Sequence, residues 1–360
     1  MRAKQLLGLS VIAVMTGLMA LPLGPGLGAA GEAGSSYKVL EPIRHNNLTI
    51  FPVVANRTHD TKDFLTLDEG LRSGEVVVSE GGMIRPLIRG RQHPMPPGPQ
   101  VNQLVLVNNS KRPLLLLAGE ILTGGNQDRV VGKDRIVPAE SDPIDLGVFC
   151  VEPHRWVATK TGFGSFRSQM AQPSVRKSAM ADQDQRKVWS EVGASAAKME
   201  ALVPQAAPSI QATSSYAGVM GNDEVKQRVE AEAAPLEQSY QGVMRELRDR
   251  KAVGVVVAVN DQIVWADLFA STALLEKYWP KLVRSYAAEA LTRSTAASHP
   301  DLKTAQTFLR NFEARRETVE REPGLFRRTE LEGDGFTAFE LTTLLPGTGF
   351  DIHIAKMANQ

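Results

Sequence analysis

The chain has 360 residues, of which 42% are hydrophobic, and its 41 lysines and arginines nearly balance its 40 aspartates and glutamates. This composition excludes a chain that is disordered throughout, and the single cysteine, Cys150, excludes a disulfide scaffold. The net charge of +1 gives no electrostatic basis for nucleic acid as a partner, and the length suffices for one large domain or two ordinary ones.

The first 33 residues have the pattern of a secretory signal peptide. Two basic residues, Arg2 and Lys4, precede an apolar run over residues 6–23, and small residues follow up to Ala33. This order predicts export to the periplasm or the cell exterior, with cleavage of residues 1–33. The alternative is an N-terminal membrane anchor, because an uncleaved run of this length nearly spans a bilayer. A membrane is a partner only in that second case.

Residues 37–157 predict an antiparallel β unit. Short apolar runs at 48–54, 75–79, 130–131 and 144–151 are separated by polar and turn-forming segments, as in a series of strands. The runs at 103–107 and 113–118 flank a cluster of turn-forming residues, so we expect these two runs to form a β-hairpin.

Residues 180–250 have a helical pattern. Val188, Val192 and Met199 fall on one face of a helix expected over 182–202. The stretch 203–222 is rich in proline, alanine, serine and threonine, which predicts a linker. A second helical pattern follows, with Pro235 expected in its first turn because proline is tolerated there.

Residues 252–292 predict a β-hairpin and a helix that Ser271 caps, with Pro280 kinking or restarting that helix. Residues 300–360 predict one more helix, over 301–312, and a C-terminal β extension. Strands, helices and strands follow one another without regular βαβ alternation, which indicates an α+β fold.

Several short motifs occur in an order that resembles a known family. They are Gly119-Glu120, residues 124–129, residues 150–156, Asp184-Gln185 with Trp189, Asp267-Leu268-Phe269 and residues 282–287. Together they resemble the uncharacterised prokaryotic domain family named for its association with ADP-ribosylglycohydrolases and rhodanese-phosphatase proteins. The resemblance covers most of residues 45–292, so 37–292 is the expected family-like domain and 300–360 an extension. It implies association with nucleotide-related or conflict-system proteins, not homology to a glycohydrolase or a phosphatase, and it supplies no catalytic residue.

The glycine-rich segment 119–126 admits two interpretations. Glycines let backbone N–H groups approach a phosphate, but the segment lacks the Lys-Ser/Thr pair of a nucleotide-binding loop, so we expect a turn between strands. Cys150 and Arg155 have the spacing of a rhodanese-type thiol loop, although Pro153 removes one N–H donor. We expect Cys150 to be a buried structural residue.

Glu120 and Glu152 each follow an apolar strand and are the candidate catalytic residues. If the two strands are neighbours, their carboxylates converge at a separation suited to acid–base hydrolysis. The alternative is that they form structural ion pairs with Arg129 and Arg155.

The candidate ligand-binding residues form a polar patch around the same strand ends. They are Gln127, Asp128, Arg129, Arg155 and Trp156. The two arginines predict an anionic small molecule held by forked hydrogen bonds. No metal or cofactor is expected, because the histidines show no metal-ligand spacing.

Three functions stay open. The first is an exported accessory or ligand-binding protein with this anion-recognising patch. The second is a hydrolase that uses Glu120 and Glu152 on a nucleotide- or ADP-ribose-type substrate. The third is a structural or interaction protein without a small-molecule site, for which a protein partner is possible. Whether the chain is an enzyme stays open too. The four tryptophans are expected in the core, and Lys281, Arg284 and Arg293 on a solvated helix face.

Overall fold

The structure is a computed structural model that describes residues 36–81, 100–156, 162–167, 169–246, 251–294, 296 and 298–359. The predicted signal peptide, residues 1–33, lies outside these ranges. Within them, no helix combines the length and the apolar character that crossing a bilayer requires. The strands form mostly antiparallel sheets, and the helices form separate layers. This arrangement confirms the predicted α+β fold.

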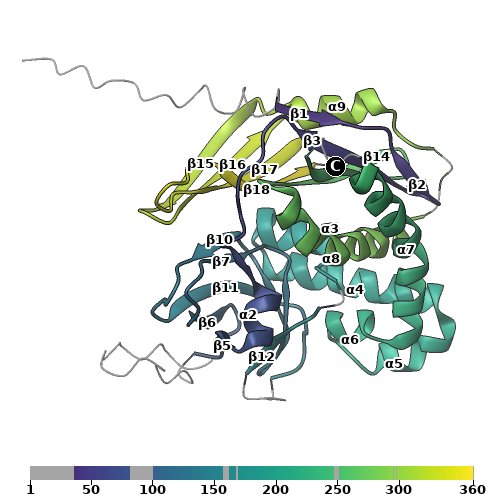
Figure 1. Ribbon diagram of the computed structural model, residues 1–360. Helices are drawn as coiled ribbons and strands as arrows, with labels where there is room; N and C mark the ends of the chain where they lie inside the picture. The colour runs from purple at the N-terminus through teal and green to yellow at the C-terminus, as the bar shows by residue number, and fades with distance from the viewer. Residues whose placement is uncertain are drawn as a thin grey trace, which may run out of the picture.

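The larger sheet has nine strands in the described part of the chain (Figure 1). They are β1 (Tyr37–Val39), β2 (Ile43–His45), β3 (Leu48–Ala55), β13 (Ala252–Val259), β14 (Gln262–Phe269), β15 (Ala314–Glu322), β16 (Phe326–Gly333), β17 (Phe336–Thr343) and β18 (Asp351–Ala358). Their order is β1-β3-β13-β14-β18-β17-β16-β15, with β2 also paired to β3.

Helices cover both faces of this sheet around the central strand β13. Every residue of β13 is buried, and alternate side chains enter different apolar clusters. Val255 and Val257 pack in the cluster that holds helix α8 (Thr272–Leu291), whereas Val256 and Ala258 pack in the cluster that holds α9 (Leu302–Arg310). Figure 1 shows α9 on one side of the sheet and α8 on the other. Because helices cover both faces of the sheet at β13, this strand is apolar on both faces.

The predicted β13–β14 hairpin and the cap of the following helix are confirmed. Ser271 accepts a hydrogen bond from the Leu274 N–H at the start of α8. Pro280 does not restart the helix but lies inside it. Pro280 and Glu276, whose carbonyl loses its helical partner, are both exposed, so water can replace the missing bond.

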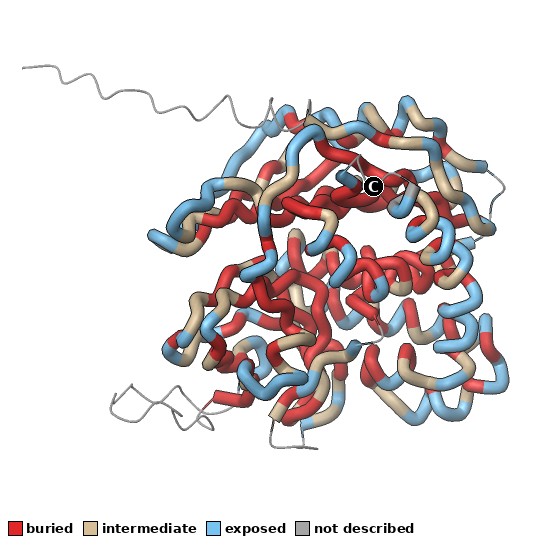
Figure 2. Tube along the Cα trace, in the orientation of Figure 1, coloured by how far each residue is buried: buried red, intermediate tan, exposed pale blue. Residues whose placement is uncertain are grey.

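The C-terminal strands are part of the larger sheet and not a separate extension. Strand β18 lies between β14 and β17, and it pairs with the hairpin strand β14 over residues 353–357. The boundary expected between 292 and 300 therefore does not divide the sheet. Strand β15 was not predicted from the sequence. It lies at the edge of the sheet, and residues 314–321 are all exposed, as the pale blue tube in Figure 2 shows.

The smaller β unit contains two sheets. A six-stranded sheet runs in the order β12-β8-β9-β11-β6-β5, and a three-stranded one in the order β10-β7-β4. The strands are β4 (Leu65–Thr66), β5 (Val76–Ser79), β6 (Gln103–Asn108), β7 (Leu114–Leu116), β8 (Ile121–Gly124), β9 (Arg129–Val131), β10 (Arg135–Val137), β11 (Ile144–Cys150) and β12 (Phe163–Ser165).

The hairpin expected at 103–118 is wrong, because β6 and β7 belong to different sheets. The Asn108 side chain donates to the carbonyls of Arg112 and Pro138, at 2.8 and 2.9 Å. These bonds hold the intervening turn against the segment after β10 and carry the chain from one sheet into the other. The pair β4–β7 is parallel, so the unit is not purely antiparallel as predicted.

The remaining helices lie between and beside the two β units (Figure 1). They are α2 (Leu67–Ser73), α3 (Pro173–Lys177), a π-helical turn (Ser178–Asp182), α4 (Gln185–Leu202), a 3-10 turn (Pro204–Ala206), α5 (Ala207–Gln211), α6 (Tyr216–Met220) and α7 (Asp223–Glu246). The predicted linker 203–222 is thus wrong, because it folds into short helices. Pro235 lies inside α7 and not in a first turn; it is exposed, as is Ala231, whose carbonyl it leaves without a helical partner.

Candidate functional site

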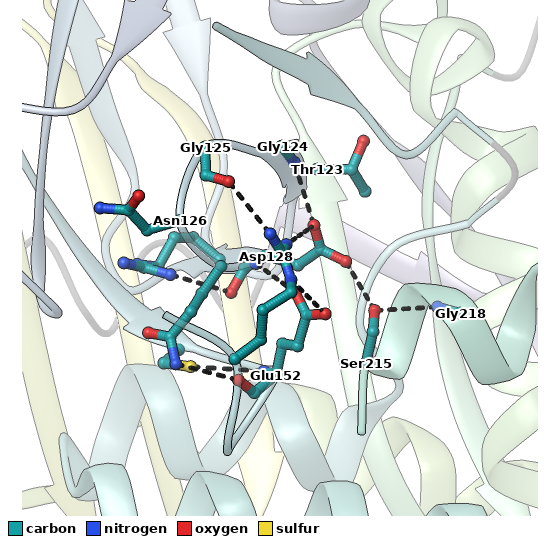
Figure 3. A network of polar contacts seen from close by, with 12 residues as sticks. Thr123, Gly124, Gly125, Asn126, Asp128, Glu152, Ser215 and Gly218 are labelled. Atoms are coloured by element: carbon teal, nitrogen blue, oxygen red, sulfur yellow. Dashed lines mark hydrogen bonds and ion pairs between the residues drawn. The ribbon is translucent and has the colours of Figure 1, made fainter. Parts of the chain in front are cut away.

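Motif residues from separate parts of the chain meet at one end of the six-stranded sheet. The turn between β8 and β9 contributes Gln127 and Asp128, the segment after β11 contributes Glu152 and Arg155, and Ser215 reaches in from the start of α6. Figure 3 shows Asp128 between Gly124 and Ser215, close to Glu152. The structure therefore brings together six of the seven predicted site residues, and only Glu120 lies apart. The six are Gln127, Asp128, Arg129, Glu152, Arg155 and Trp156.

The glycine-rich segment is a β8–β9 turn, as expected, and three of its N–H groups donate to carboxylates of the protein. Gly124 N–H donates to Asp128 at 3.0 Å, Asn126 N–H to Glu80 at 2.9 Å, and Asp128 N–H to Glu152 at 2.9 Å. Gly125 has φ +52, and a Cβ there would lie 2.2 Å from the Phe163 ring. At these three donors a carboxylate of the protein occupies the place that a phosphate oxygen would take in a phosphate-binding loop.

Glu152 and Arg155 form the ion pair that one of the sequence alternatives predicted. Arg155 donates to the two Glu152 oxygens at 2.6 and 2.5 Å, and to the Gly125 carbonyl at 3.1 Å. The bond to Glu152 raises the pKa of Arg155, and burial raises the pKa of Asp128, which accepts from Ser215 Oγ at 2.6 Å. Because Arg155 bonds to the turn itself, its role in this state is to hold the turn in shape.

Arg129 is different, because its guanidinium is buried with donors unused. Its Nη1 reaches the Asp128 carbonyl at 3.4 Å, while Nε and Nη2 have no hydrogen-bond partner among the described residues. The nearest carboxylate oxygen, on Glu80, is 4.0 Å away, and burial lowers the pKa of Arg129. The Trp156 ring lies 5.9 Å from the guanidinium carbon and is 47% exposed. One oxygen each of Glu80 and Gln127 is likewise buried with no hydrogen-bond partner in the part of the chain that the structure describes.

Cys150 is buried, which confirms the expectation for this residue. Burial raises the pKa of its thiol, so a thiolate nucleophile is disfavoured. The Gln185 side chain bonds both the N–H and the carbonyl of Cys150, each at 2.8 Å, and thereby joins α4 to β11. The expectation that all four tryptophans are in the core is wrong for Trp156 and Trp189, which are 47% and 37% exposed.

Glu120 lies apart from this cluster. Its Oε1 accepts from Lys281 Nζ at 3.1 Å, and Lys281 also bonds Asp68. Lys281 is thus buried and not on a solvated face as predicted. Burial raises the pKa of Glu120, although the positive charge of Lys281 opposes this shift. Burial would lower the pKa of Lys281, but the carboxylates of Glu120 and Asp68 outweigh it, so the pKa of Lys281 is raised.

The two candidate catalytic carboxylates do not converge. Strand β7, which precedes Glu120, pairs with β10 and β4, and β11, which precedes Glu152, pairs with β6 and β9. The backbone carbonyl of Glu120 accepts from the Val131 N–H, and Val131 pairs with Val148, four residues before Glu152. At roughly 3.3 Å per residue, the backbone positions of Glu120 and Glu152 are offset by about 13 Å along the strands before any sideways spacing. A two-carboxylate hydrolase needs about 5–10 Å.

A second polar cluster, fully buried, was missed by the sequence reasoning. The Asp267 carboxylate accepts hydrogen bonds from both Nη atoms of Arg176, at 2.8 and 3.0 Å, and from the Tyr286 hydroxyl. It also lies within hydrogen-bond distance of His353 Nε2, at 3.1 Å. His353 Nδ1 lies 2.6 Å from Asp134. Asp267 and Tyr286 fall within quoted motifs, but Asp134, Arg176 and His353 carry no local signal. We call these five residues the buried charge network.

The buried charge network predicts a stability that depends on pH. Burial alone would lower the pKa of His353, but Asp134 and Asp267 outweigh it and raise the pKa to about 8. A raised histidine pKa stabilises the fold fully below about pH 6.5, and the stabilisation is lost as the pH rises through 8. Between pH 6 and pH 9 the wild type should lose about 2 kcal/mol relative to His353→Gln, at 1.36 kcal/mol per pKa unit.

Urea denaturation at both pH values checks this expectation. Other groups titrate in the same range, such as Lys356, whose pKa is lowered by burial to about 7. Their contribution is the same in the wild type and the variant, so it cancels in the comparison. Parallel pH profiles of wild type and His353→Gln would contradict a protonated His353.

Comparisons with known proteins add a family and no close relative. A family model described as the ARG and Rhodanese-Phosphatase-superfamily-associated Protein domain matches residues 36–356. No curated protein matches the chain, and neither does any solved structure. The matched range includes β15 to β17 and most of β18, so the expectation that 300–360 lies outside the family is wrong. Among the described residues, no group of His, Cys, Asp or Glu has the arrangement of a metal site.

Proposed function

Since the chain belongs to the family of the ARG and Rhodanese-Phosphatase-superfamily-associated Protein domain, we propose that it is an exported accessory protein that binds an anionic ligand at Arg129 and Trp156. The observation that carries the proposal is the Arg129 guanidinium, which is buried with two donor atoms unpartnered among the described residues. Export rests on the signal-peptide pattern of residues 1–33.

The energetic cost of burying the Arg129 donors without partners favours binding of an anion there. A buried donor without a partner costs on the order of 1–3 kcal/mol, and more where the group is charged. A ligand oxygen placed at Nε and Nη2 would recover that cost and replace the weak 4.0 Å approach of Glu80. Forked N–H donors fit a carboxylate or a phosphate.

Trp156 suggests what else the ligand carries. Its ring lies over Arg129 and is nearly half exposed, so a flat ring of the ligand can stack on it once the anionic group has reached the guanidinium. We read the first word of the family description as ADP-ribosylglycohydrolase, which directs the choice toward nucleotide- and ADP-ribose-type ligands.

The other candidate functions have less support. The register gives the two carboxylates no shared site, and Glu152 and Glu120 each bond a cation of the protein. A structural role would leave the unpartnered Arg129 donors unexplained. The sequence predicted Arg155 as an anion-binding residue together with Arg129. In the proposed site Arg155 instead supports the turn between β8 and β9.

Thermal unfolding with ADP-ribose, ADP, sugar phosphates and inorganic phosphate tests the proposal. A ligand at 100 times its Kd adds about 2.7 kcal/mol to the stability of the folded state, so the wild-type Tm should rise by several degrees. Trp156→Ala and Arg129→Lys should abolish the rise, because they remove the flat surface and the forked donors. Arg315→Gln, on the exposed edge strand β15, is the control and should keep it.

Two outcomes would overturn the proposal. One is that no anion in the panel shifts the wild-type Tm. The other is that a shift persists in Trp156→Ala, which is the safer variant because the residue is half exposed and its loss should leave the fold intact.

A further inference from the structure

Strand β15 forms the outer edge of the larger sheet. It is the last strand in the order of that sheet, and its residues 314–321 are all exposed (Figure 1). In an antiparallel ladder, only alternate residues direct their N–H and C=O groups toward the neighbouring strand. The other half of the β15 backbone groups therefore points away from β16, where a further strand can pair with them.

The edge is already formed as a strand. β15 pairs with β16 from Ala314 to Glu322, and two ion pairs tie it to the smaller β unit. Lys133 Nζ lies 2.5 Å from Glu320 Oε1, and Arg135 Nη2 lies 2.9 Å from Glu322 Oε2. A partner strand would therefore meet a backbone that is held in its extended form, which lowers the entropy lost on pairing.

The charges along β15 are complementary to themselves when the strand is turned end for end about Val319. Glu317, two positions before Val319, then lies opposite Arg321, two positions after it. Arg316, three positions before, lies opposite Glu322, three positions after. A two-fold axis through Val319 makes each opposite-charge pair occur twice. Cross-strand pairs of opposite charge stabilise a sheet.

Neighbouring registers lack this complementarity. With the axis at Thr318, Arg315 would lie opposite Arg321 twice, and with the axis at Glu320, this glutamate would lie opposite itself. With the axis at Val319, Thr318 lies opposite Glu320 and no like charges are paired. Like charges directly opposite each other destabilise a sheet, so the charges select one register.

Three side chains on one face of β15 are available for this contact. Glu317, Val319 and Arg321 share that face, because successive strand residues point to opposite sides. Glu317 and Arg321 are exposed and form no ion pair within the part of the chain that the structure describes. Val319 is 47% exposed between them, and on the axis it would meet the Val319 side chain of the second copy.

We propose that β15 pairs antiparallel with β15 of a second copy of this chain, with Val319 on the two-fold axis. The dimer joins two nine-stranded sheets into one continuous sheet. Charged side chains on an edge oppose pairing with unrelated chains, and these do as well, because a copy of the same strand presents the complementary order. A contact along one strand is small beside the roughly 1,600 Å² of a standard interface, so the dimer should be reversible.

Sedimentation velocity of the full chain at increasing protein concentration tests this proposal. The wild type should pass from monomer to dimer. Glu317→Arg places arginines opposite each other, and Arg321→Glu places glutamates opposite each other. Each single variant should weaken dimerisation by roughly ten-fold or more, because the substituted position enters two pairs in a two-fold dimer.

Charge exchange makes the test specific for this register. The double variant Glu317→Arg with Arg321→Glu restores both opposite-charge pairs and should dimerise like the wild type. A mixture of the two single variants should form a heterodimer, because a strand with two arginines then faces a strand with two glutamates. Arg315→Gln lies opposite Pro323 in this register and is the control that should leave dimerisation unchanged.

Three results would overturn the proposal. One is a wild type that stays monomeric at every concentration. The second is a dimer that persists unweakened in both single variants, which would place the contact elsewhere. The third is failure of both the double variant and the mixture to restore dimerisation. Because the substituted side chains are exposed, the fold should be retained in each variant, and circular dichroism checks that it is.

Discussion

Asp267→Asn should lower the free energy of unfolding by about 3–5 kcal/mol, the range found when one partner of a buried ion pair is removed. Asp267 is fully buried and is the anion that Arg176, Tyr286 and His353 share. Burial would raise its pKa, but Arg176 and His353 hold the pKa well below the ordinary value, so the residue is charged in the fold. Asparagine keeps the size but leaves a buried guanidinium without its counter-charge.

Urea denaturation at pH 6, where His353 is protonated, measures this loss. Asp301→Asn is the matched control, because Asp301 is an exposed N-cap of α9 and asparagine caps equally well. The control should change stability by less than about 1 kcal/mol. A loss of that small size at Asp267 would show that the buried charge network contributes little.

Lys281→Met should have an effect of similar size, about 3–5 kcal/mol, for a different reason. Lys281 is the cation between Glu120, which is fully buried, and Asp68, which is partly exposed. Methionine keeps the apolar stem but leaves Glu120 as a buried charge that must take up a proton. The loss should therefore shrink as the pH falls toward 5, because protonation of Glu120 removes the uncompensated charge.

The double variant Lys281→Met with Glu120→Gln distinguishes this cause from lost packing. If the uncompensated charge dominates, the double variant is more stable than Lys281→Met alone, and a double-mutant cycle gives a coupling energy of about 1–3 kcal/mol. Additive losses in the cycle would show that the two side chains act independently.

Elements with a strong local pattern could be predicted from the sequence. The hairpin β13–β14, the cap at Ser271 and the helix α4 were predicted because their apolar spacing, turn residues and caps lie within about 20 residues of one another. The ion pair of Glu152 and Arg155 belongs to the same class, since only three positions separate the partners.

Elements decided by distant contacts could not be predicted. Strand β15 has the sequence ARRETVERE, with no apolar alternation, and forms only because it pairs with β16 at the edge of the sheet. Charged residues are expected on such an edge, because they oppose pairing with other chains. The pairs of Glu120 with Lys281 and of Asp134 with His353 are equally distant in sequence, so local spacing carries no trace of them.

The order of strands in the larger sheet also has a consequence for how the protein is made. The middle hairpin β13–β14 pairs on one side with β3, from early in the chain, and on the other with β18, from late in it. Both pairings close long loops, which is slow, and the second requires residues 351–358 to have been synthesised. A partly synthesised chain therefore has no complete larger sheet and no His353 to close the buried charge network.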